Sequence, residues 1–151
     1  MPQIGTSRQQ TVTTILLIDD NPNDLEIWSK ALQTRGDHYS VLTAISGEVA
    51  LGLLKQVQID CVVLDLDLPQ ISGFELLFQL VPDRKAPQMP VIVLTRLWNP
   101  TLRQLALDHG ATAHLLKNGT SVEDLDKAIK QALAAVATTK DEWRTPLRPT
   151  G

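Results

Sequence analysis

The sequence predicts an α/β fold in which a parallel sheet carries helices on both faces. Short apolar segments rich in β-branched residues predict strands at residues 14–18, 39–44, 61–64, 91–94 and 113–116. Longer stretches with the apolar spacing of helices separate them. Strict alternation of strands and helices is typical of a parallel sheet. Strands that are apolar throughout, such as Val-Ile-Val-Leu, are typical of a sheet that is covered on both sides.

Capping residues support the predicted helices. Asn21 followed by Pro22 predicts an N-cap and a first helical position. Ser72 begins a Ser-x-x-Glu pattern, which is typical of a capping box. Ser121 is placed to cap the last helix, and Gly110 stands where a helix should end. These residues lie where the spacing of apolar residues changes between that of a strand and that of a helix.

Length and composition indicate a single domain. The chain has 151 residues, of which 43% are hydrophobic and 21% charged, as in an ordinary globular protein. We expect a domain over residues 13–136, a flexible N-terminal tail over 1–12 and a flexible C-terminal tail or linker over 137–151. The net charge of −3 does not favour direct nucleic-acid binding, which normally shows as a strongly basic patch.

Other broad classes are also disfavoured. No apolar run approaches the roughly 20 residues that span a bilayer, so we expect no membrane association. The first ten residues lack the apolar core of a signal peptide, which favours a cytoplasmic protein. Cys61 is the only cysteine, so an intramolecular disulfide cannot form.

Polar residues follow four of the five predicted strands. The set consists of Asp19, Asp20, Asp65, Thr95 and Lys117. Taken singly, each residue would suit a solvated turn or a helix cap. Because the carboxyl ends of parallel strands meet at one edge of a sheet, where ligands bind, we expect the five side chains to lie together.

Such a set suits phosphoryl transfer. Clustered carboxylates repel one another and favour a hard cation such as Mg²⁺, which binds oxygen ligands. The metal partly neutralises an incoming phosphoryl group, and Asp65 can then attack phosphorus to give an acyl phosphate. Lys117 supplies a compact positive charge and Thr95 a hydroxyl donor for the phosphoryl oxygens. Catalysis of this kind consists mostly of positioning and electrostatics.

Four segments resemble the successive signatures of response-regulator receiver domains: ILLIDDNPND, VVLDLDLPQISG, VIVLT and GATAHLLK. The match runs from about Thr14 to Ala135. The resemblance implies a flavodoxin-like, three-layer (βα)5 fold with a five-stranded parallel sheet in the order 2-1-3-4-5. It also implies a phosphoacceptor, Asp65, and a Mg²⁺ site made by Asp19, Asp20, Asp65 and the backbone carbonyl of Asp67.

The resemblance further implies roles, partners and a mode of output. Thr95 is then the switch hydroxyl and Lys117 the phosphate-binding lysine. A histidine kinase or histidine phosphotransfer protein would donate the phosphoryl group, and a downstream protein or fused effector would respond. A homodimer through the fourth helix, fifth strand and fifth helix is compatible with the family. No enzymatic activity is expected beyond self-phosphorylation from small donors and autodephosphorylation.

Three positions depart from the family pattern. Asn118 stands where proline is common, and Asn118-Gly119 is expected to form a turn instead. Arg96 follows Thr95 in place of a small residue, and could cover the phosphoryl group, slow its hydrolysis or pair with an acidic neighbour. His114 replaces the aromatic that turns inward when the threonine moves. It is either a partly exposed surface imidazole or a pH-sensitive switch residue.

Three other classes of protein share parts of this pattern with a phosphorylated receiver. A pseudo-receiver that binds partners without phosphorylation would share the fold. Haloacid-dehalogenase-like phosphatases resemble this set through Asp65-Leu-Asp67, but their DxD follows the first strand and their acidic pair comes last. A flavodoxin-type flavin binder needs a Ser/Thr/Gly-rich phosphate loop after the first strand, where this chain has DDNPND. We therefore favour the phosphorylated receiver.

Overall fold

A computed structural model describes residues 12–35, 38–83 and 89–144, with side chains described as far as residue 137. The expected N-terminal tail lies almost wholly outside these residues. Among the described helices, none combines the length and the apolar character that crossing a membrane would require.

The strands form one parallel sheet in the order β2-β1-β3-β4-β5. They are β1 Thr13–Ile18, β2 Tyr39–Ala44, β3 Cys61–Leu64, β4 Val91–Thr95 and β5 Ala113–Leu116. The predicted parallel sheet and its 2-1-3-4-5 order are confirmed.

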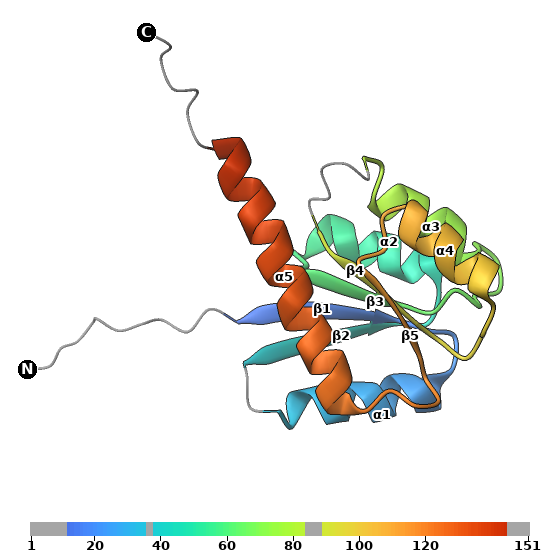
Figure 1. Ribbon diagram of the computed structural model, residues 1–151. Helices are drawn as coiled ribbons and strands as arrows, with labels where there is room; N and C mark the ends of the chain where they lie inside the picture. The colour runs from blue at the N-terminus through green and yellow to red at the C-terminus, as the bar shows by residue number, and fades with distance from the viewer. Residues whose placement is uncertain (1–11, 36–37, 84–88, 145–151) are drawn as a thin grey trace, which may run out of the picture.

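Helices follow each strand and cover the two faces. They are α1 Pro22–Gln33, α2 Gly47–Gln56, α3 Gly73–Leu80, α4 Pro100–Asp108 and α5 Val122–Arg144. Figure 1 shows α1 and α5 on one side of the sheet and α2, α3 and α4 on the other. The chain therefore has the predicted three-layer α/β architecture.

Two apolar cores account for this arrangement. Successive residues of a strand point to opposite faces, so β1 sends Leu16 and Ile18 toward α2 and α3, and Ile15 and Leu17 toward α1 and α5. Because both faces are covered by helices, the positions of β1 from Ile15 to Ile18 are all apolar, whichever face they point to. Cys61 lies in the second core, where burial raises the pKa of its thiol to about 12.

The predicted caps form at the helix ends. The side chain of Asn21 accepts hydrogen bonds from amides in the first turn of α1. Ser72 accepts one from the N–H of Glu75, and Ser121 caps α5 through the N–H of Asp124 at 3.0 Å. Gly110, just past α4, has a φ of 102°, which a residue without a Cβ adopts freely.

The end of α5 differs from the prediction. The helix continues to Arg144, beyond the expected domain boundary at residue 136. Residues 137–144 lack an apolar stripe, so the sequence pattern does not predict a helix there. They include alanine, lysine, glutamate and arginine, which have high helix propensity, and the next proline comes only at position 146. The helix therefore ends later than expected, the flexible C-terminal tail or linker itself stays a prediction, and residues 145–151 lie outside the described part.

Candidate functional site

The carboxyl edge of the sheet holds a polar hollow of about 190 Å³. Asp19 follows β1, Asp65 follows β3, Thr95 ends β4 and Lys117 follows β5, so parallel strands deliver all four to the same edge. The full lining is Asp19, Asp20, Asn21, Asp65, Asp67, Thr95, Arg96, Leu97 and Lys117. The structure thus brings together the phosphoryl and metal-site residues named from the sequence.

Lys117 is the centre of the cluster. Its Nζ donates hydrogen bonds to Asp19 Oδ2 at 2.5 Å, Asp65 Oδ2 at 2.8 Å and Asp24 Oδ2 at 2.9 Å. The Lys117 side chain is only 4% exposed. Burial alone would disfavour its charge, but the hydrogen bonds that it donates to the carboxylates outweigh this effect and raise the pKa above the usual lysine value. Lys117 is therefore a buried, charged ammonium.

A turn after β5 positions this lysine. The Lys117 N–H donates to the carbonyl oxygen of Thr95 at 2.8 Å, which ties the end of β5 to β4. A turn over residues 117–119 follows, and Gly119 has a φ of 111°, in the region that favours glycine. The turn expected at Asn118-Gly119 is confirmed.

Two of the carboxylates are oriented by the backbone. Asp19 Oδ1 accepts from the N–H of Asn21 at 2.9 Å, and Asp65 Oδ1 accepts from the N–H of Asp67 at 3.0 Å. In each case one oxygen binds the loop that follows and the other binds Lys117. Burial raises the pKa of Asp19 above its usual value, while its bond to Lys117 opposes that rise.

Three carboxylates could hold a metal ion. Asp19, Asp20 and Asp65 each offer an oxygen, and these oxygens lie within 4.8 Å of one another. Asp19 and Asp65 are buried, whereas Asp20 is exposed at the mouth of the hollow. Oxygen-only ligands of this kind suit a hard divalent cation. The donor set therefore fits the predicted magnesium.

The loop after Asp65 depends on Gly73. The N–H of Gly73 donates to the carbonyl oxygen of Leu66 at 3.2 Å. A Cβ on Gly73 would lie 2.3 Å from Leu66 Cα, closer than any real contact. Because Asp65 and Asp67 flank Leu66, the start of α3 sets the position of the acceptor loop, and only glycine permits that approach.

Asp24 belongs to the cluster but was not predicted from the sequence. It lies in the first turn of α1 and is 6% exposed. Arg96 binds it with both guanidinium nitrogens, Nη1 to Oδ2 at 2.6 Å and Nη2 to Oδ1 at 3.0 Å. These bonds, opposed by burial, lower the pKa of Asp24. The acidic neighbour expected for Arg96 is therefore Asp24.

An acid in a first helical turn normally indicates only a favourable interaction with the helix dipole. The acidic run DDNPND was the one signal in the sequence that could have identified Asp24. Its partners were beyond sequence reasoning, because Arg96 lies 72 residues and Lys117 93 residues further along the chain.

Two residues named as switch elements lie on β4 and β5. Thr95 is fully buried, and its Oγ1 accepts from the N–H of Leu97 at 3.2 Å, so the hydroxyl supports its own loop. His114 is half-buried and pairs in register with Val93. Its Nε2 is buried and has no hydrogen-bond partner among the described residues. Burial, and secondly the charge of Arg103, lower the pKa of His114.

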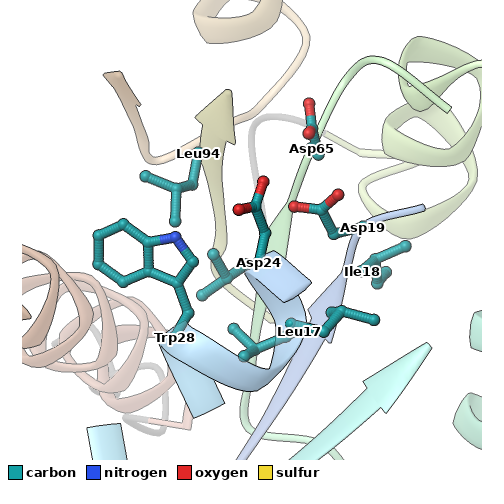
Figure 2. Close-up of a pocket in the computed structure, with 9 residues that line it drawn as sticks. Leu17, Ile18, Asp19, Asp24, Trp28, Asp65 and Leu94 are labelled. Carbon is teal, nitrogen blue, oxygen red and sulfur yellow. The ribbon is translucent and has the colours of Figure 1, made fainter. Parts of the chain in front are cut away.

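Below the carboxylates the site has an apolar floor. Figure 2 shows the carboxylates of Asp19, Asp24 and Asp65 on one side and the indole of Trp28 beside Leu94 on the other. The hollow between them has a volume of about 10 Å³, room for about one water molecule. The cluster is thus open to solvent above and closed by packed side chains below.

Comparison with known families agrees with this geometry. A model of the response regulator receiver domain matches residues 15–130. The chain belongs to the response regulator receiver domain family. Its place is in two-component signalling, in agreement with the resemblance of the four sequence segments.

Curated relatives of this receiver domain are longer proteins. A probable cyclic di-GMP phosphodiesterase of Vibrio cholerae is 38% identical over 104 residues, which is 69% of this chain and 23% of the relative. The transcriptional regulatory protein GlrR of Escherichia coli is 34% identical over 131 residues, 86% of this chain and 28% of the relative. The chain therefore spans about a quarter of these relatives.

Solved receiver domains match over nearly their whole length. A receiver domain protein from Clostridium thermocellum superimposes with a TM-score of 0.74 at 30% identity, covering 84% of this chain and 98% of that one. A beryllofluoride-activated DrrB receiver domain gives a TM-score of 0.66 at 27% identity, covering 87% of this chain and 99% of that one. The shared fold thus takes in nearly the whole of each solved domain.

Proposed function

We propose that this receiver domain takes up a phosphoryl group on Asp65, from a histidine kinase or a histidine phosphotransfer protein, in the presence of Mg²⁺. The observation that carries the proposal is the sharing of one buried ammonium, Lys117 Nζ, by three carboxylates. Such a cluster has an excess of negative charge that a divalent cation would balance, and a lysine ready to bind phosphoryl oxygens.

Each residue of this chain has a distinct part in the proposed step. The Asp65 carboxylate is oriented by the N–H of Asp67, so that its other oxygen is presented beside Lys117. Attack by that oxygen forms the acyl phosphate while the donor departs with the bonding electrons. Lys117 then stabilises the charge of the phosphoryl oxygens, and Thr95, at the end of β4, supplies a hydroxyl.

Mg²⁺ would be held by Asp19, Asp20, Asp65 and the backbone carbonyl of Asp67. When bound, it supplies positive charge that offsets repulsion between the carboxylates and the incoming phosphoryl group. Asp19 and Asp65 each have one oxygen bound to Lys117 in this structure. We therefore expect metal binding at these carboxylates to weaken their hydrogen bonds with this lysine.

The output of the domain is proposed to be a change of protein contacts. Thr95 would move toward the phosphoryl group and His114 would turn inward behind it. A downstream protein or a fused effector would read the change, and the α4-β5-α5 face is the candidate surface for a homodimer. Direct nucleic-acid binding, membrane binding and turnover of an external substrate are not proposed for this domain.

A pseudo-receiver is the competing function. A binding module that works without phosphorylation does not require Lys117 at the centre of an acidic cluster, and no described contact favours such a module over a phosphorylated receiver. The two functions differ in whether Asp65 gains a phosphoryl group.

Incubation with Mg²⁺ and acetyl phosphate tests the proposal. We expect one added phosphoryl group in the intact mass, which disappears after mild base because acyl phosphates hydrolyse readily. Asp65→Asn should add none, whereas Asp67→Asn, with its carboxylate exposed at the rim, should still be labelled. An unlabelled wild-type protein, or a label that persists in Asp65→Asn, would favour the pseudo-receiver.

A further inference from the structure

Asp24 is an anion placed between two cations. One carboxylate accepts hydrogen bonds from both terminal nitrogens of Arg96 and from Nζ of Lys117. The Asp24 side chain is 9% exposed and that of Lys117 is 4% exposed, whereas Arg96 approaches from the surface with 53% exposed. The Asp24 carboxylate thus accepts hydrogen bonds from an ammonium and a guanidinium, two groups that could otherwise bind another oxyanion.

A phosphoryl group on Asp65 would require the same cations. Lys117 Nζ lies 2.8 Å from Asp65 Oδ2 and 2.9 Å from Asp24 Oδ2, so the two acids share it almost equally. A phosphoryl group carries about two negative charges and three acceptor oxygens. Each hydrogen bond that Asp24 retains is one that the phosphoryl group lacks.

We propose that Asp24 is a positioning residue that competes with the phosphoryl group for Arg96 and Lys117, and so lowers the affinity of the site for phosphoryl groups. The proposal deepens the function proposed above and rests on it. Asp24 is neither the acceptor nor a member of the predicted metal site. It acts through the two cations that it holds.

The two cations are retained to different degrees. Arg96 binds Asp24 through two nitrogens, a planar geometry that matches a carboxylate and resists separation. Lys117 makes one bond to Asp24 and two to other acids, so its ammonium can turn toward a new anion without losing all its partners. Asp24 therefore competes weakly with the phosphoryl group for Lys117 and strongly for Arg96.

Beryllofluoride titration of four proteins tests this competition. With Mg²⁺ saturating, the affinity for beryllofluoride is measured for wild type, Asp24→Asn, Arg96→Ala and the double variant. We expect Asp24→Asn to bind about tenfold more tightly, since it frees both cations; a tenfold change corresponds to about 1.4 kcal/mol. Arg96→Ala should change the affinity by at most about twofold in wild type, but should remove most of the gain in Asp24→Asn.

Glu26→Gln is the matched control. It removes one carboxylate from the same helix. Glu26 is exposed, and its ion pair is with Lys30 and not with a residue of the site. Its beryllofluoride affinity should equal that of wild type. Melting curves of all variants establish that they fold. If Asp24→Asn does not fold, Arg96→Ala still tests the proposal, because Arg96 is more than half exposed and its replacement should not prevent folding. A tenfold loss of beryllofluoride affinity in Arg96→Ala would overturn the proposal.

The remaining outcomes are also decisive. An unchanged or weaker affinity in Asp24→Asn, or an equal effect of Arg96→Ala in both backgrounds, overturns the competition while leaving phosphorylation of Asp65 intact. A wild-type protein that binds no beryllofluoride and gains no phosphoryl group overturns the proposed function, and this inference with it. The two failures are thus separated by the behaviour of the wild-type protein.

Discussion

Two buried charged clusters in this receiver domain have opposite compositions. At the carboxyl edge of the sheet, the buried cation Lys117 contacts Asp19, Asp24 and Asp65, and the more exposed Arg96 contacts Asp24 alone. On the α1-α5 side, one acid, Asp126 of α5, contacts several donors. Its Oδ1 accepts a hydrogen bond from Tyr39 Oη at 2.5 Å, and its Oδ2 lies 3.2 Å from Lys130 Nζ and 3.6 Å from Arg35 Nη2.

The difference separates a structural cluster from a functional one. Burial by itself would raise the pKa of Asp126, but hydrogen bonds from Tyr39 and Lys130 outweigh it and lower the pKa. That acid is fully compensated, and its contacts connect α5 to β2 and to Arg35, which lies just past the end of α1. The Lys117 cluster has more acids than cations, so it remains incomplete without a further positive charge. An excess of negative charge, more than burial alone, is the reason for which we propose a cation site at the first cluster and not at the second.

The largest expected effect comes from removing the cation. Lys117→Met should destabilise the metal-free protein by about 3 kcal/mol, because it leaves buried carboxylates without compensation. Saturating Mg²⁺ should restore much of this loss, because a divalent cation replaces the missing charge. Urea unfolding with EDTA and with Mg²⁺ measures both effects.

Asp126→Asn is the matched variant in the compensated cluster. It should cost about 1–2 kcal/mol through weakened hydrogen bonds, and its gain from Mg²⁺ should equal that of wild type. An equal Mg²⁺ gain in Lys117→Met and Asp126→Asn would erase the distinction between the two clusters.

A smaller effect of opposite sign is expected for Asp20→Asn. Removing one acid from the incomplete cluster relieves repulsion, so the metal-free variant should be more stable by a few tenths of a kcal/mol to about 1 kcal/mol, the range of exposed charge pairs. It should also lose most of the Mg²⁺-dependent rise in melting temperature. Asp67→Asn, whose side chain is not part of the metal group, should keep that rise. An Asp20→Asn protein with the wild-type rise would locate the metal elsewhere.

The smallest effect concerns His114, outside both clusters. Its pKa in the folded state is lowered by burial, so as the pH falls through about 6.5 the unfolded chain takes up the proton first. Stability should therefore decrease from pH 7.5 to pH 5.5 by more in wild type than in His114→Phe. Urea midpoints at the two pH values measure this, with the exposed His38→Asn as control.

The same imidazole reports on the proposed switch. If His114 turns inward on activation, its ring pKa by NMR should be lower with beryllofluoride than without, because deeper burial disfavours the charged form. Equal values would mean that His114 takes no part in the switch, whereas the stability effect of its present burial would stand.

Local pattern was enough to predict the strands, the helices and the parallel sheet of this protein, whereas the strand order came from the resemblance to receiver domains. The strand β2 has the predicted bounds, Tyr39–Ala44, and the caps at Asn21 and Ser72 form where the residue types indicated. Apolar period and capping act between near neighbours, so a sequence displays them directly. Parallel topology then carries the residues after each strand to one edge, which is why Asp65 and Lys117 could be expected to meet.

Only the tertiary structure decided which charges pair. The bond of Arg96 to Asp24 joins residues 72 apart, and that of Tyr39 to Asp126 joins residues 87 apart. Neither pair has a periodic signal, because each depends on side-chain reach across packed elements. The continuation of α5 was missed for a related reason: helix propensity extends it without the apolar stripe by which helices are recognised. The pattern of apolar and capping residues determines where the helices and strands lie. Which of their side chains interact depends on how close the fold brings them.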